Sequence, residues 1–243
     1  MIKFQISDET KRRLDAYDKQ RAAMEAAMSR KQGNPATAVA RRVLSSLVKV
    51  QHEPGNWGTG FRVDDFIITA AHCLPRYPTF DNPAFVPVWG HKKGPVRGVK
   101  VMGMSIFADA DSDLAILSCH DDHWEEYDNL LSQLTPLQLA QKPMRTNVPV
   151  CAHVYGSKDK WINGNAVVHG IATSNVEFSK DIPSGTSGGP LINRYGQVIG
   201  VASHGPTRIK SKYDTMTFAF LPNALPVWVL KRLENHGWLD PPP

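Results

Sequence analysis

Short apolar runs separated by turn-forming residues are the feature that most constrains the fold of this chain. From residue 47 onward about eleven such runs follow one another, each bounded by Gly, Pro, Asn or Asp. Runs of this length predict β-strands, and many short strands at short intervals predict a barrel or a sandwich. The runs are Leu47–Val50, Gly60–Val63, Phe66–Thr69, Phe85–Val88, Val99–Met104, Leu114–Leu117, Val148–Val154, Ala166–Ala172, Pro190–Asn193, Val198–Ala202 and Met216–Phe220.

Helical patterns flank this β region on both sides. Ser7 is a suitable N-cap for a helix over about Asp8–Arg30, which has a thin apolar face rich in alanine and methionine. A second, short helix is predicted to start near Ala36 and to pass Leu44. At the other end of the chain, Asn223–His236 is amphipathic and ends at Gly237, which is typical of a terminal helix.

The charge of the chain is mildly basic and gives little information about partners. The net charge is +5 in 243 residues, of which 42% are hydrophobic and 21% charged. In the β region the lysines and arginines gather over residues 92–100 and 208–212, between predicted strands, where solvated loops usually carry charge. No nucleic-acid-reading motif accompanies them, so no nucleic-acid partner is expected.

The three cysteines, Cys73, Cys119 and Cys151, are odd in number and form no CxxC pair. Free thiols are typical of a reducing compartment, and Met1–Gln20 lacks the apolar core of a secretory signal. No apolar run approaches the ~18–20 residues that span a bilayer. We therefore expect a cytoplasmic protein without a membrane segment.

A histidine follows the third apolar run, in the segment Phe66-Ile-Ile-Thr-Ala-Ala-His72-Cys73. The two small alanines allow tight backbone packing while the imidazole lies at the end of a strand. A histidine in this position is more often structural, so the motif alone does not establish a site.

An aspartate precedes another apolar run, in Asp111-Ser-Asp113-Leu-Ala-Ile-Leu117. A carboxylate at the edge of the core is able to accept the second N–H of an imidazole and fix its tautomer. The alternative is a turn aspartate before a strand, which is common.

A serine lies among glycines in Asp181-Ile-Pro-Ser-Gly185-Thr-Ser187-Gly-Gly-Pro190. Glycines allow the backbone to turn sharply, so that the amides of Gly185 and Ser187 converge as an oxyanion hole beside a nucleophile. A plain turn or a phosphate-binding loop remains the alternative, although the lysine of a nucleotide-binding loop is missing.

Taken in order, Thr-Ala-Ala-His-Cys, Asp-Leu-Ala-Ile-Leu and Gly-Thr-Ser-Gly-Gly-Pro resemble the three signatures of the trypsin/chymotrypsin superfamily. The resemblance implies a serine endopeptidase acting on protein or peptide substrates, in which Ser187 is the nucleophile, His72 the general base and Asp113 the residue that orients the histidine. It implies no cofactor and no metal.

The same resemblance implies a mostly β fold of two antiparallel six-stranded barrels, with an N-terminal helical extension and a C-terminal helix. The expected extension covers residues 1–46 and the protease domain residues 47–243. Within the domain, the barrels are expected over about 47–135 and 145–222, followed by the terminal helix over 223–236.

Two departures place the chain closer to bacterial and high-temperature-requirement-type members than to animal trypsins. The cysteine that normally pairs with Cys73 is absent from its expected place near Trp57. Thr186 stands where trypsins carry the aspartate of the zymogen switch, so activation by a new N-terminus is not expected. No PDZ domain is expected after the protease domain.

Specificity and regulation are less constrained by the sequence. Asp181 matches the position of the trypsin pocket aspartate and favours Arg or Lys at P1, unless its loop directs it to the surface. Ser203-His204-Gly205 resembles the strand edge that pairs with the substrate backbone. The helix over Asp8–Arg30 either docks a regulatory protein partner or packs on its own domain.

Two further interpretations complete the predictions. His120 and His123, which flank two aspartates, are better explained by a polar loop than by a metal site. A catalytically silent protease fold that serves as a binding module is the alternative to an enzyme.

Overall fold

A computed structural model of the chain describes residue 12 and the ranges 33–75, 84–109, 113–119, 123–140, 148, 150–156, 158–168, 175–178, 182–203 and 215–218. The chain divides into two units, Met1–Gly33 and Asn34–Pro243, and all strands in the described ranges belong to the second. The helix predicted over Asp8–Arg30 lies outside the described residues except for Arg12, which is helical. The helix predicted over Asn223–His236 lies wholly outside them.

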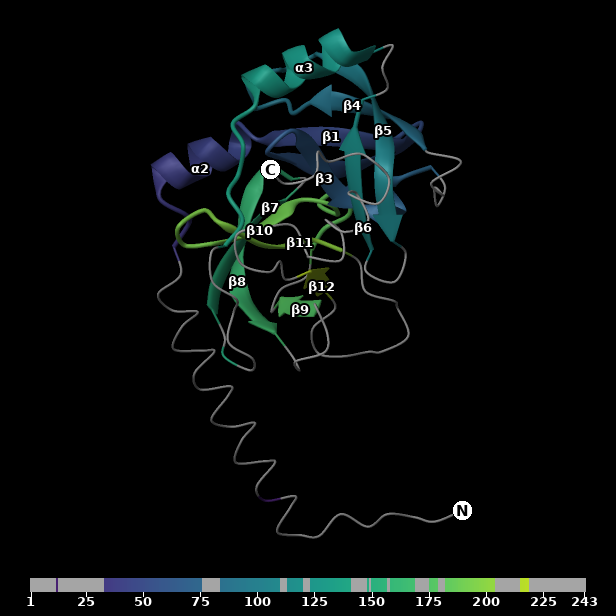
Figure 1. Ribbon diagram of the computed structural model, residues 1–243. Helices are drawn as coiled ribbons and strands as arrows, with labels where there is room; N and C mark the ends of the chain where they lie inside the picture. Colours follow the sequence, from purple (N-terminus) through teal and green to yellow (C-terminus); the bar gives the residue numbers. More distant parts are fainter. Residues whose placement is uncertain are drawn as a thin grey trace, which may run out of the picture. The chain divides into compact units, whose positions relative to one another are not determined.

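Six strands form a closed antiparallel barrel in the order β1-β2-β3-β6-β5-β4 (Figure 1). The pairing of β1 with β4, in which Val50 faces Val88, closes it. Both valines are fully buried, because alternate residues of these strands point into the barrel. The structure thus confirms a mostly β protein with one closed barrel. Its strands are β1 (Leu47–Glu53), β2 (Asn56–Val63), β3 (Phe66–Ala70), β4 (Phe85–Gly90), β5 (Lys100–Asp109) and β6 (Leu114–Ser118).

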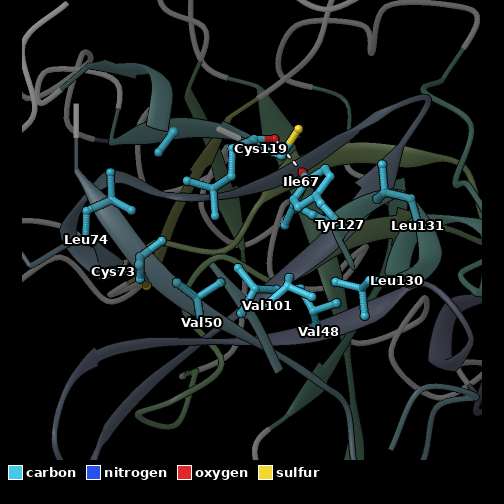
Figure 2. Close-up of a cluster of buried hydrophobic side chains, with 14 of the residues drawn as sticks. Val48, Val50, Ile67, Cys73, Leu74, Val101, Cys119, Tyr127, Leu130 and Leu131 are labelled. Atoms are coloured by element: carbon cyan, nitrogen blue, oxygen red, sulfur yellow. Dashed lines mark hydrogen bonds between the residues drawn. The ribbon is translucent and has the colours of Figure 1, made fainter. Parts of the chain in front are cut away.

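An α-helix, α3 (Trp124–Gln133), lies beside β5 and extends the barrel core. Its buried residues Tyr127, Leu130 and Leu131 join a cluster of barrel side chains (Figure 2). The hydroxyl of the fully buried Tyr127 donates a hydrogen bond of 2.9 Å to the carbonyl oxygen of Leu117 on β6. The helix is therefore part of the folded barrel domain and not a surface addition.

The C-terminal end of α3 is held by an arginine from the barrel. Arg62 of β2 donates from Nη1 to the carbonyl oxygens of Leu131 and, at 2.8 Å, Leu134. The last carbonyls of a helix lack partners within the helix and carry partial negative charge. A guanidinium at this position supplies both the missing hydrogen-bond donors and a compensating positive charge. Glu125 and Glu126 in the first turn are favourable for the opposite reason.

A second antiparallel sheet has the strand order β11-β10-β7-β8-β9-β12. Its core contains Ala152, Val154, Phe178 and Leu191, with Ile199 among the residues of the hairpin that ends it. Within the described residues, each strand pairs with its neighbours in this order, and β11 and β12 are the two edge strands of an open sheet. The strands are β7 (Val150–Gly156), β8 (Lys160–Val168), β9 (Asn175–Phe178), β10 (Pro190–Asn193), β11 (Val198–Val201) and β12 (Thr215–Phe218).

A shared core joins the barrel to the second sheet. Leu47 and Phe61 of the barrel cluster with Ile192 and Val201 of the second sheet, and all four are fully buried. The predicted short helix near Ala36 is present as α2 (Thr37–Leu44), and its Val43 enters the same core. This core fixes the two β structures against each other, which allows one site to draw residues from both.

Candidate active site

His72 and Asp113 are brought together by neighbouring strand ends. His72 lies in the 3-10 turn η1 (Ala71–Cys73) directly after β3, and Asp113 directly precedes β6. The pairing of Ala70 with Leu114 joins these ends, and the Ala71 N–H donates to the Asp113 carbonyl oxygen at 3.0 Å. The local ladder therefore fixes both backbones before any side chain is considered.

The side chains add two hydrogen bonds to this backbone contact. The His72 backbone N–H donates to Asp113 Oδ1 at 2.9 Å, and the His72 ring Nδ1 lies 2.7 Å from Asp113 Oδ2. With the ring proton on Nδ1, Nε2 is the ring nitrogen that is able to accept a proton. Asp113 adopts a left-handed backbone with φ of 49°. For a non-glycine residue this conformation costs about 1–3 kcal/mol and occurs mostly where surrounding structure enforces it.

Ser203 supplies a third hydrogen bond to the same carboxylate. Its hydroxyl donates to Asp113 Oδ2, and only 4% of the residue is exposed. The sequence placed Ser203 at a substrate-binding edge, and its contact with Asp113 was not predicted. The carboxylate thus receives donors from the barrel and from Ser203, which lies two residues beyond the end of β11.

The main electrostatic effect falls on the histidine. The hydrogen bond to the Asp113 carboxylate raises the pKa of His72 above its ordinary 6.5, because it favours the positively charged imidazolium. Burial of the ring acts in the opposite direction, since it penalises the charged form, but it is the weaker influence.

The loop around Ser187 is shaped by two glycines with positive φ. Gly185 has φ of 82°, in a turn closed by a hydrogen bond of 3.1 Å from the Thr186 N–H to the Pro183 carbonyl oxygen. Gly188 has φ of 83°, and a Cβ there would lie 2.1 Å from the Thr59 carbonyl oxygen. Both positions require glycine, one for its conformation and one also for space.

The barrel holds this loop through the backbone of β2. The Thr59 N–H donates to the Ser187 carbonyl oxygen at 2.7 Å, and the Thr59 hydroxyl donates to the Gly185 carbonyl oxygen at 2.8 Å. On the other side, the Gly188 N–H donates to the Ala202 carbonyl oxygen at 2.6 Å. Ser187 is therefore fixed between the barrel and the end of β11, and it is 4% exposed.

Cys73, which follows His72, links the histidine turn to the serine loop. Its thiol lies 3.6 Å from the Ser187 carbonyl oxygen, and it is a free, buried cysteine. The residue opposite it is Gly58, where a Cβ would lie 2.4 Å from Cys73 Sγ. The place expected near Trp57 for a pairing cysteine is thus held by a glycine one residue later, and the thiol occupies the space.

The remaining predicted residues fall outside the part of the chain that the structure describes. Asp181, His204 and Gly205 belong to this group.

Among the described residues, no three His, Cys, Asp or Glu side chains are grouped as metal ligands. The helices of these ranges are also too short or too polar to cross a membrane.

A closed six-stranded barrel with a second antiparallel sheet, a hydrogen-bonded His–Asp pair and a serine in a glycine loop define the class of trypsin-like proteins. The family model for the trypsin-like peptidase domain matches residues 58–201. The chain belongs to this family and is a serine endopeptidase. No curated protein sequence matches it.

Solved serine proteases share the fold. Rv3671c protease from M. tuberculosis in its active form is 21% identical, with a TM-score of 0.53 over 87% of this chain and 91% of that one. The serine endoprotease from Yersinia pestis is 18% identical, with a TM-score of 0.53 over 84% of this chain and 69% of that one. The HtrA-type protease AlgW with a tripeptide is 16% identical, with a TM-score of 0.54 over 84% and 65%. At these identities the likeness concerns the fold alone.

Proposed function

We propose that the chain hydrolyses peptide bonds with Ser187 as nucleophile, His72 as general base and Asp113 as the group that orients the base. The observation that carries the proposal is the set of hydrogen bonds on the Asp113 carboxylate, from the His72 backbone, the His72 ring and Ser203. They support a histidine whose Nδ1 proton is held by the carboxylate, so that Nε2 is the ring nitrogen that exchanges a proton with Ser187.

The reaction follows from these roles. The Ser187 hydroxyl attacks the peptide carbonyl carbon while its proton passes to His72 Nε2, and the Asp113 carboxylate stabilises the imidazolium. The N–H groups of Gly185 and Ser187 bind the oxyanion. The imidazolium then gives its proton to the leaving amine, which departs and leaves an acyl-enzyme. Water then attacks the ester carbonyl carbon and gives a proton to His72. The bond from this carbon to the Ser187 oxygen breaks, the serine oxygen takes the proton from His72, and the acid product is released.

The proposal extends to the rest of the fold. The second sheet, within about residues 145–222, is the second barrel of the family, and residues 1–46 are an extension preceding the domain over 47–243. The contact between β11 and β12, the two ends of the strand order, supports closure of this sheet. The terminal helix over 223–236 completes the domain.

Specificity and control are also part of the proposal. Asp181 lies at the base of the primary pocket and selects Arg or Lys at P1. Ser203-His204-Gly205 pairs with the substrate backbone, which is supported by the position of Ser203 two residues beyond the end of β11. A regulatory protein binds through the helix over Asp8–Arg30, and the enzyme acts in the cytoplasm.

Turnover of a mixed peptide library tests the function. Ser187→Ala is expected to abolish cleavage while Ser132→Ala, an exposed serine on α3, retains it. The residues found before the cleaved bonds report the P1 preference. If the folded wild-type protein cleaves nothing, or if Ser187→Ala cleaves at the wild-type rate, the proposal is wrong. Inactivity of the wild type would favour the binding module instead.

A further inference from the structure

A cavity of about 280 Å³ opens beside the serine loop. Its lining includes Ser184 and Gly185 of the loop and Gly58 of β2, and it includes none of His72, Asp113 or Ser203. The cavity therefore adjoins the proposed oxyanion site at Gly185, and neither member of the His–Asp pair forms part of its wall.

The position of the cavity relative to Ser187 identifies the half of a substrate that would reach it. The residues before Ser187 line the cavity, whereas the residues after it are bonded to the end of β11, through Gly188 and Ala202. A peptide that crosses the nucleophile in an extended conformation has its two halves on opposite sides. If its acyl half pairs with the edge at Ser203, its leaving-group half lies in the cavity.

The charge of the cavity is positive. Lys49 and Lys92 line it, and Asp159 is the one carboxylate among its lining residues. Asp159 Oδ2 pairs with Lys92 at 2.6 Å and more distantly with Lys93 at 3.9 Å, so a single carboxylate faces two lysines there. Lys49 adds a further positive charge, for which no carboxylate partner is found within the described ranges.

Lys49 is positioned by aromatic rings. Its ammonium lies 5.1 Å from the centroid of the Trp57 ring, and Trp57 packs edge-on against Trp89 at 5.9 Å. A cation over an indole face keeps its charge accessible while its stem is held in place. His91, which is 7% exposed, lines the same cavity. Burial lowers its pKa, and although the Asp159 carboxylate opposes this effect, the nearby lysines add to it. The ring therefore adds no positive charge to the cavity, and the lysines supply it.

We propose that this cavity binds an acidic side chain of the substrate on the C-terminal side of the scissile bond, through Lys49 and Lys92. The inference rests on the proposed function, because it takes Ser187 as the reacting centre. A glutamate or aspartate within the first three residues after the cleaved bond supplies the missing negative charge. Its carboxylate accepts charge-assisted hydrogen bonds from the ammonium groups of Lys49 and Lys92.

Pairs of quenched fluorescent peptides test the proposal. Each pair carries the acyl half found in the library experiment, a C-terminal amide, and either Glu or Gln at one of the three positions after the scissile bond. We expect Glu to raise kcat/KM about tenfold at one position, and the advantage to fall with added salt. Lys49→Gln and Lys92→Gln should each reduce the advantage, and the double variant should remove it. Asp159→Asn should increase it.

Two controls separate the possible failures. Lys158→Gln removes an exposed lysine that does not line the cavity and should leave the preference unchanged. A coumarylamide with the same acyl half has no residue in the cavity, so its turnover should not respond to the lysine variants. If the wild type does not turn over the coumarylamide at all, the proposed function itself is wrong.

Three outcomes would overturn the inference while the enzyme remains active. The first is equal cleavage of Glu and Gln peptides at all three positions. The second is a Glu preference that survives in the double lysine variant. The third comes from shorter peptides that end at these positions with either a free carboxylate or an amide. If the free carboxylate is preferred and Glu is not, the cavity binds the end of a chain and not an acidic side chain.

Discussion

The carboxylate of Asp113 holds His72 at two points, the backbone N–H at 2.9 Å and the ring Nδ1 at 2.7 Å. Each carboxylate oxygen therefore accepts one bond from the same residue. This arrangement leaves the ring no freedom to exchange its two nitrogens, and it makes the tautomer of His72 depend on a single side chain.

Asp113→Asn should lower kcat by a factor of about 10⁴, the size of the equivalent change in trypsin, because an amide nitrogen cannot accept the proton on Nδ1. The asparagine has nearly the same shape, so the fold should persist. Steady-state kinetics on a library-derived peptide, together with a thermal melt, provide the measurement. A loss of less than tenfold would show that the carboxylate does not act through the histidine.

The pH profile of the wild-type enzyme should reflect the raised pKa of His72. Only the neutral imidazole accepts the Ser187 proton, so kcat/KM should fall as pH drops through the pKa of His72. Since the Asp113 hydrogen bond raises that pKa, the midpoint of the acidic limb should lie above pH 6.5. The residual activity of Asp113→Asn should show a lower midpoint. An acidic limb below pH 6.5 in the wild type would contradict this account.

Gly188→Ala should destabilise the protein by about 2–5 kcal/mol, because it adds both a strained backbone and a Cβ 2.1 Å from the Thr59 carbonyl oxygen. Gly98→Ala is the matched control, since Gly98 has the same φ of 83° but open space around it. Its cost should be about 1–2 kcal/mol, from conformation alone. Urea denaturation measures both, and equal costs would exclude the close contact at Gly188.

Tyr127→Phe should destabilise the protein by about 1 kcal/mol, because the Leu117 carbonyl oxygen loses a buried donor. The ring itself remains in the core, so packing is unchanged. Tyr195→Phe, at a residue that is 58% exposed, should be nearly neutral. Denaturation midpoints of the two variants distinguish the cases, and an unchanged midpoint for Tyr127→Phe would mean that the hydroxyl contributes nothing to stability.

The strands were predictable from sequence because their apolar runs are bounded by turn residues, as at Pro190–Asn193, whose predicted limits match β10. The helix α3 was missed, although Tyr127, Leu130 and Leu131 follow a helical i, i+3, i+4 spacing. The acidic and polar residues around His123 suggested a loop, and they outweighed the short apolar stripe.

The site was predictable only where its residues form local motifs. His72, Asp113 and Ser187 each lie in such a motif, and the ladder between β3 and β6 explains why the first two meet. Ser203 contacts Asp113 across 90 residues of sequence, and no periodicity encodes such a contact. The pairing of Lys92 with Asp159 depends in the same way on how the barrel and the β7–β8 turn are brought together.

The identity of the nucleophile is tested most directly by mapping the residue that a fluorophosphonate modifies. The protein is labelled, digested and sequenced by mass spectrometry, with Ser187→Ala and Ser132→Ala treated alike. The account predicts one adduct, on Ser187, that is absent from Ser187→Ala and undiminished in Ser132→Ala. An adduct on another serine, or no adduct in a preparation that cleaves peptides, would contradict it.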